Sequence, residues 1–221
     1  MLAAAYFGAE PARNLLFADV VTRLEARKTI LASGDAATLD ADTALADHTD
    51  GAERLITLFE GATLFDVAQN ARPFEVSAGA LTIEVLGATF EAARFDDMVV
   101  VSVSEGQVRV MTGNTRWTLE DGERLLWSAQ GGGDVVDIDP AAVARWRQDR
   151  CVSDGLTFAQ VADVIDRRLP GNVVVPNKAL ATSRVSGTSN LDNPTLALEA
   201  LAATQCARVF SAQPLGYLIL P

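Results

Sequence analysis

The chain has 221 residues, 49% of them hydrophobic and 21% charged, so it can fold around a core without disulfides or metals. Eighteen Lys and Arg against 29 Asp and Glu give a net charge of −11, which argues against direct binding to DNA or to an anionic membrane. The longest stretch without a charged residue, 209–221, is too short for a membrane-spanning helix, which takes about 20 residues.

The region from about Arg23 to Trp127 alternates apolar and polar residues, the period of half-buried β-strands. Asp121-Gly122 between two such runs predicts a β-hairpin. The fold class predicted here is mostly β, a sandwich or rolled antiparallel sheet. The runs expected as strands are 54–59, 63–68, 73–76, 81–86, 89–93, 98–104, 107–111, 115–119 and 124–127.

The pattern changes after the glycines at 131–133. Residues 140–150 predict a short helix or turn that carries Trp146. A helix is expected over 157–169, where Thr157 and Gln160 form a capping box, and another begins at Asn193-Pro194. With short strands around these helices, the C-terminal part is predicted to be a small α+β module of order βαββαββ.

The domains predicted from this change of period are four. Residues 1–22 form an N-terminal segment, 23–133 the all-β domain, 134–145 a linker, and 146–221 the α+β domain. The boundary is expected near the glycines because domain boundaries fall where few contacts hold the chain.

Catalytic residues are not evident. The one histidine, His48, has no accompanying Gly-x-Ser-x-Gly nucleophile motif, and a solvated loop is the expected place for it. Asp40, Asp42, Asp47 and Asp50 cluster nearby but lack the calcium-loop pattern, so an acidic solvated loop is expected there too. The chain is therefore predicted not to be an enzyme.

Metal and cofactor sites are not predicted either. Cys151 and Cys206 have no ligand spacing for zinc and are expected to be small buried apolar residues, although a disulfide closing the C-terminal module remains an alternative. The glycines at 131–133 lack the motif of a phosphate-binding loop. The three tryptophans are expected in the core or at the domain junction.

Several segments resemble, in order and spacing, the FecR-type sigma-factor regulators. In the β-rich part they are 61–68, 72–76, 82–90, 101–108 and 119–123, and Arg145-Trp146-Arg147 resembles the start of the family's C-terminal segment. Residues 184–188 and 198–202 are similar to the secretin-and-TonB N-terminal (STN-like) module with which these proteins end. The family's cytoplasmic sigma-binding segment and membrane helix are missing, so the chain is expected to be the periplasmic part alone.

The resemblance implies a periplasmic signal-relay domain in cell-surface signalling. Its partner would be the signalling domain of an outer-membrane TonB-dependent transducer, often one for iron-siderophore uptake, and the response would pass to an extracytoplasmic-function sigma factor through the absent cytoplasmic segment. No nucleic acid is expected to bind directly, and the absent helix would be the sole link to the membrane. The alternatives are an envelope structural or assembly module and a β-scaffold envelope enzyme.

The partner is expected to bind the C-terminal module, because an exposed strand edge can be extended by a partner strand. Two short apolar strands next to proline are the candidate edges. Their residues are Val173, Val174, Val175, Tyr217, Leu218, Ile219 and Leu220.

Overall fold

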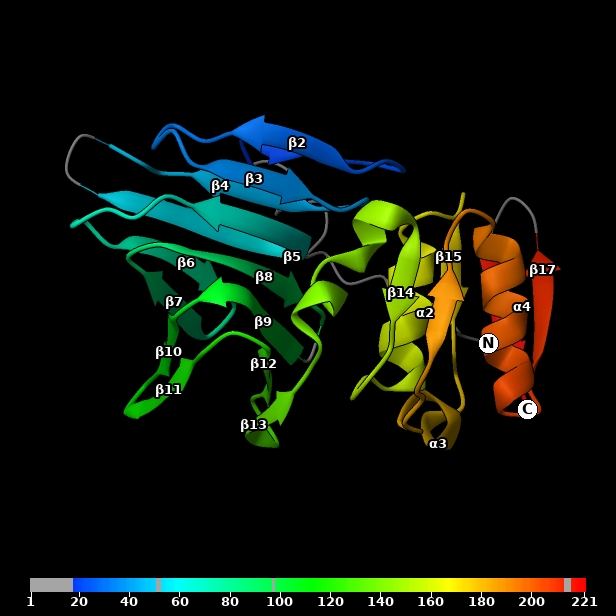
Figure 1. Ribbon diagram of the computed structural model, residues 1–221. Helices are drawn as coiled ribbons and strands as arrows, with labels where there is room; N and C mark the ends of the chain where they lie inside the picture. The colour runs from blue at the N-terminus through cyan, green and yellow to red at the C-terminus, as the bar shows by residue number, and fades with distance from the viewer. Residues whose placement is uncertain (1–17, 51–52, 97, 213–215) are drawn as a thin grey trace, which may run out of the picture.

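The structure is a computed structural model that describes residues 18–50, 53–96, 98–212 and 216–221. Its β-rich part is followed by a smaller part with helices (Figure 1). No helix in these ranges is long and apolar enough to cross a membrane. Most of the predicted 1–22 segment lies outside the described residues.

Thirteen strands form one curled sheet in the β-rich part. They run along the main path β11-β10-β7-β6-β5-β8-β9-β12-β13, with β1 to β4 joined beside β5. The strands are β1 (Val20–Val21), β2 (Arg27–Ile30), β3 (Ala36–Leu39), β4 (Ala44–Asp47), β5 (Arg54–Val67), β6 (Phe74–Ala78), β7 (Leu81–Val85), β8 (Ala88–Arg94), β9 (Met98–Gly106), β10 (Val108–Thr112), β11 (Thr115–Leu119), β12 (Glu123–Ser128) and β13 (Gly132–Asp137).

The two halves of this sheet face each other and share β5. The start of β5 pairs with β4 and β6, and its end pairs with β3 and β8. Phe65 on the second half lies 5.6 Å from the Phe74 ring and 5.3 Å from the Phe90 ring, measured between centroids. All three rings are fully buried. The predicted fold class, a mostly β sandwich or rolled sheet, is confirmed, although β5 and β6 run parallel.

Two local predictions in this part are wrong. The expected strands 54–59 and 63–68 are one strand, because Gly61 adopts a φ of +86° and bends β5 without ending it. The expected hairpin at Asp121-Gly122 does not form, since β11 pairs with β10 while β12 pairs with β9 and β13. That turn carries the chain from one half of the sheet to the other.

The predicted linker is partly strand. Residues 132–137 are β13, which pairs with β12 along its whole length. Gly133 leaves room for the ring of Trp117, whose Cζ2 would lie 2.6 Å from a Cβ at this position. The glycines therefore serve the packing of the sheet. The domain boundaries themselves stay a prediction.

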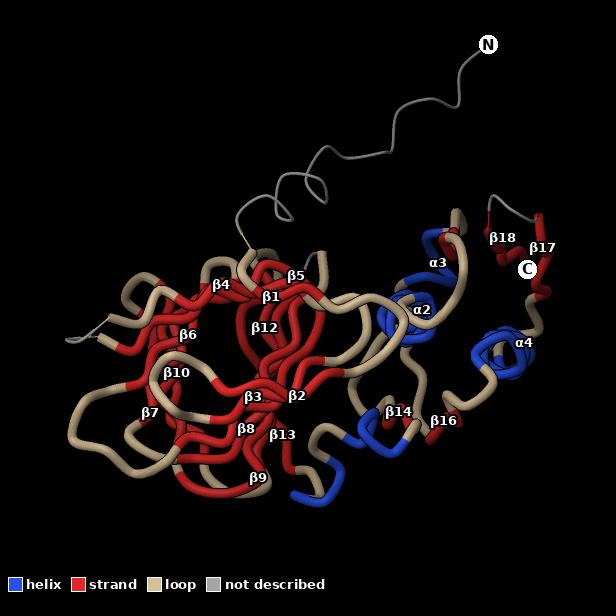
Figure 2. The backbone as a smooth tube through the Cα atoms, turned by 90° about the horizontal axis from the view of Figure 1, so that it is seen from above, coloured by secondary structure: helices blue, strands red, loops and turns tan. Residues whose placement is uncertain are grey.

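The C-terminal part places two helices between two small sheets. Figure 2 shows α2 and α4 between the β14–β16 pair on one side and β17 and β18 on the other. Its elements are the 3₁₀ turns η1 (Pro140–Ala142) and η2 (Arg145–Gln148), then β14 (Arg150–Val152), α2 (Phe158–Asp166), β15 (Asn172–Val174), α3 (Lys178–Ala181), β16 (Thr188–Asn190), α4 (Pro194–Thr204), β17 (Arg208–Ala212) and β18 (Gly216–Leu220).

The helix starts agree with the sequence patterns. Thr157 and Gln160 form the reciprocal capping box of α2, and the Asn193 side chain caps α4 with Pro194 at its first turn. The order is βαββαββ with the short helix α3 added after β15. One apolar cluster joins this part to the β-rich part, with Leu64 and Val100 on one side and Phe158 and Ile165 on the other.

Candidate partner-binding surface

The three-stranded sheet of the C-terminal part has the order β15-β18-β17. β15 runs parallel to β18, and β17 runs antiparallel to it. In this register Val174 and Phe210 both lie opposite Leu218, one on each side. The three apolar side chains therefore form a row across one face of the sheet.

This face points away from the helices. The side chains of Val174 and Phe210 are 51% and 49% exposed, although both are large and apolar. Residues next to them in the strands turn inward, since Tyr217 is 7% exposed and Ile219 is fully buried. Alternation along a strand thus gives the sheet one face in the core and one apolar face in solvent.

The predicted site residues divide between the two faces. Val174, Leu218 and Leu220 belong to the outer face, while Tyr217 and Ile219 belong to the core. Val173 and Val175 are half-buried and pack against the core. The prediction that 217–220 is an edge strand is wrong, because β18 is hydrogen-bonded on both sides.

The sequence prediction missed β17 as an edge strand. Within the described residues, β17 pairs with β18 alone and lies at the end of the molecule farthest from the β-rich part (Figure 1). In the sequence the available signal was Phe210 itself, a large aromatic residue in a short apolar run. Such a residue does not have to be buried, and in the structure it is exposed. The open backbone of β17 and the apolar row form the outer sheet surface, defined by Val174, Phe210, Leu218 and Leu220.

The edge of β15 is partly occupied. The Val173 N–H donates to Asp166 Oδ1 at 2.9 Å, and Asp166 is the last residue of α2. Burial raises the pKa of Asp166 to about 7, even though the bond from Val173 favours the ionised form. A strand that pairs with β15 would have to displace this carboxylate.

Polar contacts at the junction between the two parts are buried. Arg168 pairs with Asp40 at 2.5 Å, and their side chains are 9% and 1% exposed. Glu91 accepts a bond from the Trp146 indole N–H at 2.6 Å and another from the Ala144 N–H at 3.3 Å. Burial raises the pKa of Glu91. The prediction that Asp40 lies in an acidic solvated loop is therefore wrong, because its side chain is buried in an ion pair.

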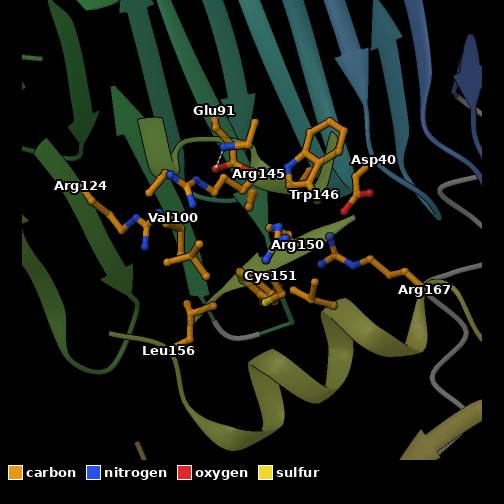
Figure 3. A pocket seen from close by; sticks show the side chains of 17 residues that line it. Asp40, Glu91, Val100, Arg124, Arg145, Trp146, Arg150, Cys151, Leu156 and Arg167 are labelled. Atoms are coloured by element: carbon orange, nitrogen blue, oxygen red, sulfur yellow. Dashed lines mark hydrogen bonds between the residues drawn. The ribbon is translucent and has the colours of Figure 1, made fainter. Parts of the chain in front are cut away.

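A cavity of about 60 Å³ lies at this junction, between the strands and α2 (Figure 3). Ligand pockets typically occupy about 300–1,000 Å³, so this one is too small for a substrate. Cys151 lines it, and burial raises the pKa of the thiol to about 12. Both cysteines are free, Cys151 buried and Cys206 exposed, so the alternative of a disulfide is not realised.

The remaining candidates for chemistry stay apart. His48 is exposed, and Asp47 accepts the backbone N–H groups of Ala32 and Thr49. Among the described residues no group of three or more His, Cys, Asp or Glu is arranged to hold a metal. The arrangement offers a recognition surface and a buried junction.

The comparisons with known proteins agree with this description. The family model "FecR protein" matches residues 18–109, while no curated protein matches. Two crystal structures of a "putative anti-sigma factor" from Parabacteroides distasonis ATCC 8503, at 1.65 and 2.50 Å resolution, share the fold. The first has a TM-score of 0.81 at 21% identity and covers 90% of this chain and 96% of its own. The second has a TM-score of 0.80 at 20% identity and covers 90% of this chain and 95% of its own. Residues 18–109 are therefore similar to the FecR protein family, and the fold over most of the chain is that of these two solved structures.

Proposed function

We propose that this chain is the periplasmic signal-relay part of a FecR-like transmembrane sigma-factor regulator. Its partner is the signalling domain of an outer-membrane TonB-dependent transducer, for iron-siderophore or other nutrient uptake. The response reaches an extracytoplasmic-function sigma factor through a cytoplasmic segment beyond this chain. The observation that carries the proposal is the outer sheet surface, an apolar face in solvent on the C-terminal α+β module.

The chemistry of that surface suits a protein partner. Addition of a strand to β17 would supply main-chain hydrogen bonds without special side chains, and the apolar row would supply buried area. Phe210 at 49% exposure is the largest side chain of the row and fits the role of an interface anchor. The net charge of −11 supports a protein partner over nucleic acid.

The test is calorimetry with the whole chain and the signalling domain of the transducer encoded beside it. The whole chain is needed because one apolar cluster spans both parts. Phe210→Ser is expected to weaken binding by about tenfold or more, as loss of an interface anchor does. Ile30→Ser is the matched control, an exposed apolar residue on β2 that should change binding less than about twofold.

The opposite result would move the site. If Ile30→Ser weakens binding and Phe210→Ser does not, the β-rich part is the receiver. If the whole chain shows no binding to the signalling domain at all, the transducer is not the partner.

A further inference from the structure

The end of helix α2 makes contacts in two directions within three residues. Asp166 accepts the Val173 N–H of β15, in the sheet that carries the outer surface. Arg168, two residues later, pairs with Asp40 of the β-rich part. Arg167 between them bonds Asp163 and lies over the Phe95 ring, 5.2 Å from its centroid. One short turn thus contacts both β15 and the junction.

The backbone of this turn is tightly bonded. The Arg167 N–H donates to the Asp163 carbonyl at 3.2 Å, and the Arg168 N–H donates to the Ile165 carbonyl at 3.1 Å. The Leu169 N–H closes the turn on the Asp166 carbonyl at 2.8 Å. Because these bonds fix the relative positions of 166 and 168, a displacement at one residue is transmitted to the other.

The junction end of the turn is anchored. Asp40 holds its own place through its backbone N–H, which donates to the Ala62 carbonyl at 2.8 Å, and through Oδ1, which accepts the Ala41 N–H at 2.8 Å. Arg168 also donates to the Val164 carbonyl at 3.3 Å. Separation of this buried pair would leave a charge without its partner, which is costly. The pair therefore favours one closed arrangement of the two parts.

The other end of the turn is held to β15 through the bond between Asp166 and the Val173 N–H. Burial is the largest cause that disfavours the ionised form of Asp166; of the neighbouring charges, Asp163 and Asp42 also disfavour it, while Arg167 favours it. The bond from Val173 opposes the unfavourable effects. Without the Val173 N–H, Asp166 loses the largest of the interactions that favour its ionised form, and its side chain has no other bond to β15 in the described residues.

We propose that the turn 166–169 couples the edge of β15 to the junction, so that loss of the bond between Asp166 and the Val173 N–H loosens the Arg168–Asp40 contact. The coupling is a property of the chain alone and does not depend on the partner strand, which the proposed function places on β17, the opposite edge of the same sheet. Two distinct sites and one element that both sites bias are what such a coupling requires.

The experiment measures amide hydrogen exchange in the whole chain without a partner. Asp166→Ala removes the acceptor of the Val173 N–H, and Asp166→Asn is the matched control because its side-chain oxygen can still accept. In the alanine variant we expect exchange to rise by about fivefold or more at Val173 and also at Asp40 and Ala41, within the usual range of coupling. The asparagine variant should change these rates less than about twofold.

The reverse arm starts from the junction. Arg168→Gln should raise exchange at Val173 by a similar factor, because coupling is reciprocal. Arg184→Gln is its control, since Arg184 is exposed and donates to the Gly155 carbonyl away from the turn. Asp40→Asn provides a second junction variant should Arg168→Gln fail to fold, as judged by circular dichroism.

The outcomes separate the possibilities. Faster exchange at Val173 in Asp166→Ala, with Asp40 and Ala41 unchanged, would overturn the coupling, as would an unchanged Val173 in both junction variants. Failure of the transducer domain to bind in calorimetry would leave the exchange result intact, so the coupling and the proposed function can fail independently.

Discussion

Gly61 is the residue at which β5 passes from one half of the sheet to the other, and Gly61→Ala tests whether this corner is obligatory. Its φ of +86° costs an L residue about 1–2 kcal/mol. A Cβ there would lie 2.2 Å from Thr43 Oγ1 and 2.6 Å from Thr43 Cα. Because the second contact is with backbone, no rotamer of Thr43 relieves it. The close approach lets the Thr43 hydroxyl accept the Ala62 N–H at 3.1 Å.

Gly34 provides a matched control. Its φ of +88° is nearly the same, but no atom lies within 4 Å of the point that a Cβ would occupy. Gly34→Ala should therefore lower the free energy of unfolding by the conformational cost alone, about 1–2 kcal/mol. Overpacking in a filled region adds about 1–3 kcal/mol, so Gly61→Ala should cost about 2–5 kcal/mol in total.

Urea unfolding followed by tryptophan fluorescence measures both losses. The double variant Gly61→Ala, Thr43→Ala should remain destabilised, because the contact with the Thr43 Cα persists. Equal losses for Gly61→Ala and Gly34→Ala would refute the reasoning, since they would mean that the corner relaxes at no cost. Full rescue by Thr43→Ala would assign the clash to the side chain alone.

Two further predictions follow from buried groups. Because the folded-state pKa of Asp166 is raised to about 7, its stabilising contribution is complete only below the unfolded value and is lost as pH rises through 7. Urea midpoints should therefore fall between pH 6 and pH 8, and fall less in Asp166→Asn; the same slope in both proteins would contradict this. In the folded chain a maleimide should label the exposed Cys206 and spare Cys151, whose thiol has a pKa of about 12; labelling of both at equal rates, followed by mass spectrometry, would show that the junction opens readily.

The strands from β5 to β12 were predictable because most of them bury alternate residues, whereas β1 to β4 and β13 were not among the predicted runs. The run at 81–86 became β7, whose residues alternate between buried and half-buried. Which strands pair with each other was harder to predict, because the period of a strand indicates which face is buried but not which strand lies beside it. Asp121-Gly122 shows this limit, because the same turn chemistry serves a hairpin and a crossing between two halves of a sheet.

The sequence correctly predicted the two strands of the candidate site, but the prediction that both are edge strands was wrong for the second. Residues 173–175 and 217–220 were identified because apolar runs between glycine and proline favour short strands. Their parallel pairing joins segments more than 40 residues apart and places the later one in the middle of the sheet. No local pattern in the sequence indicates this pairing. In the structure the second edge strand of the sheet is therefore β17 and not β18.

The junction shows the same limit for charged residues. Asp40 stands among other aspartates, and Arg167 and Arg168 follow the end of a helix, where basic residues complement the helix dipole. Both patterns have an ordinary solvent-exposed explanation, and charged residues are seldom buried unless paired. The pair that buries Asp40 and Arg168 spans 128 positions of sequence. The packing of the two parts against each other brings these residues together, and no pattern in the sequence indicates that packing.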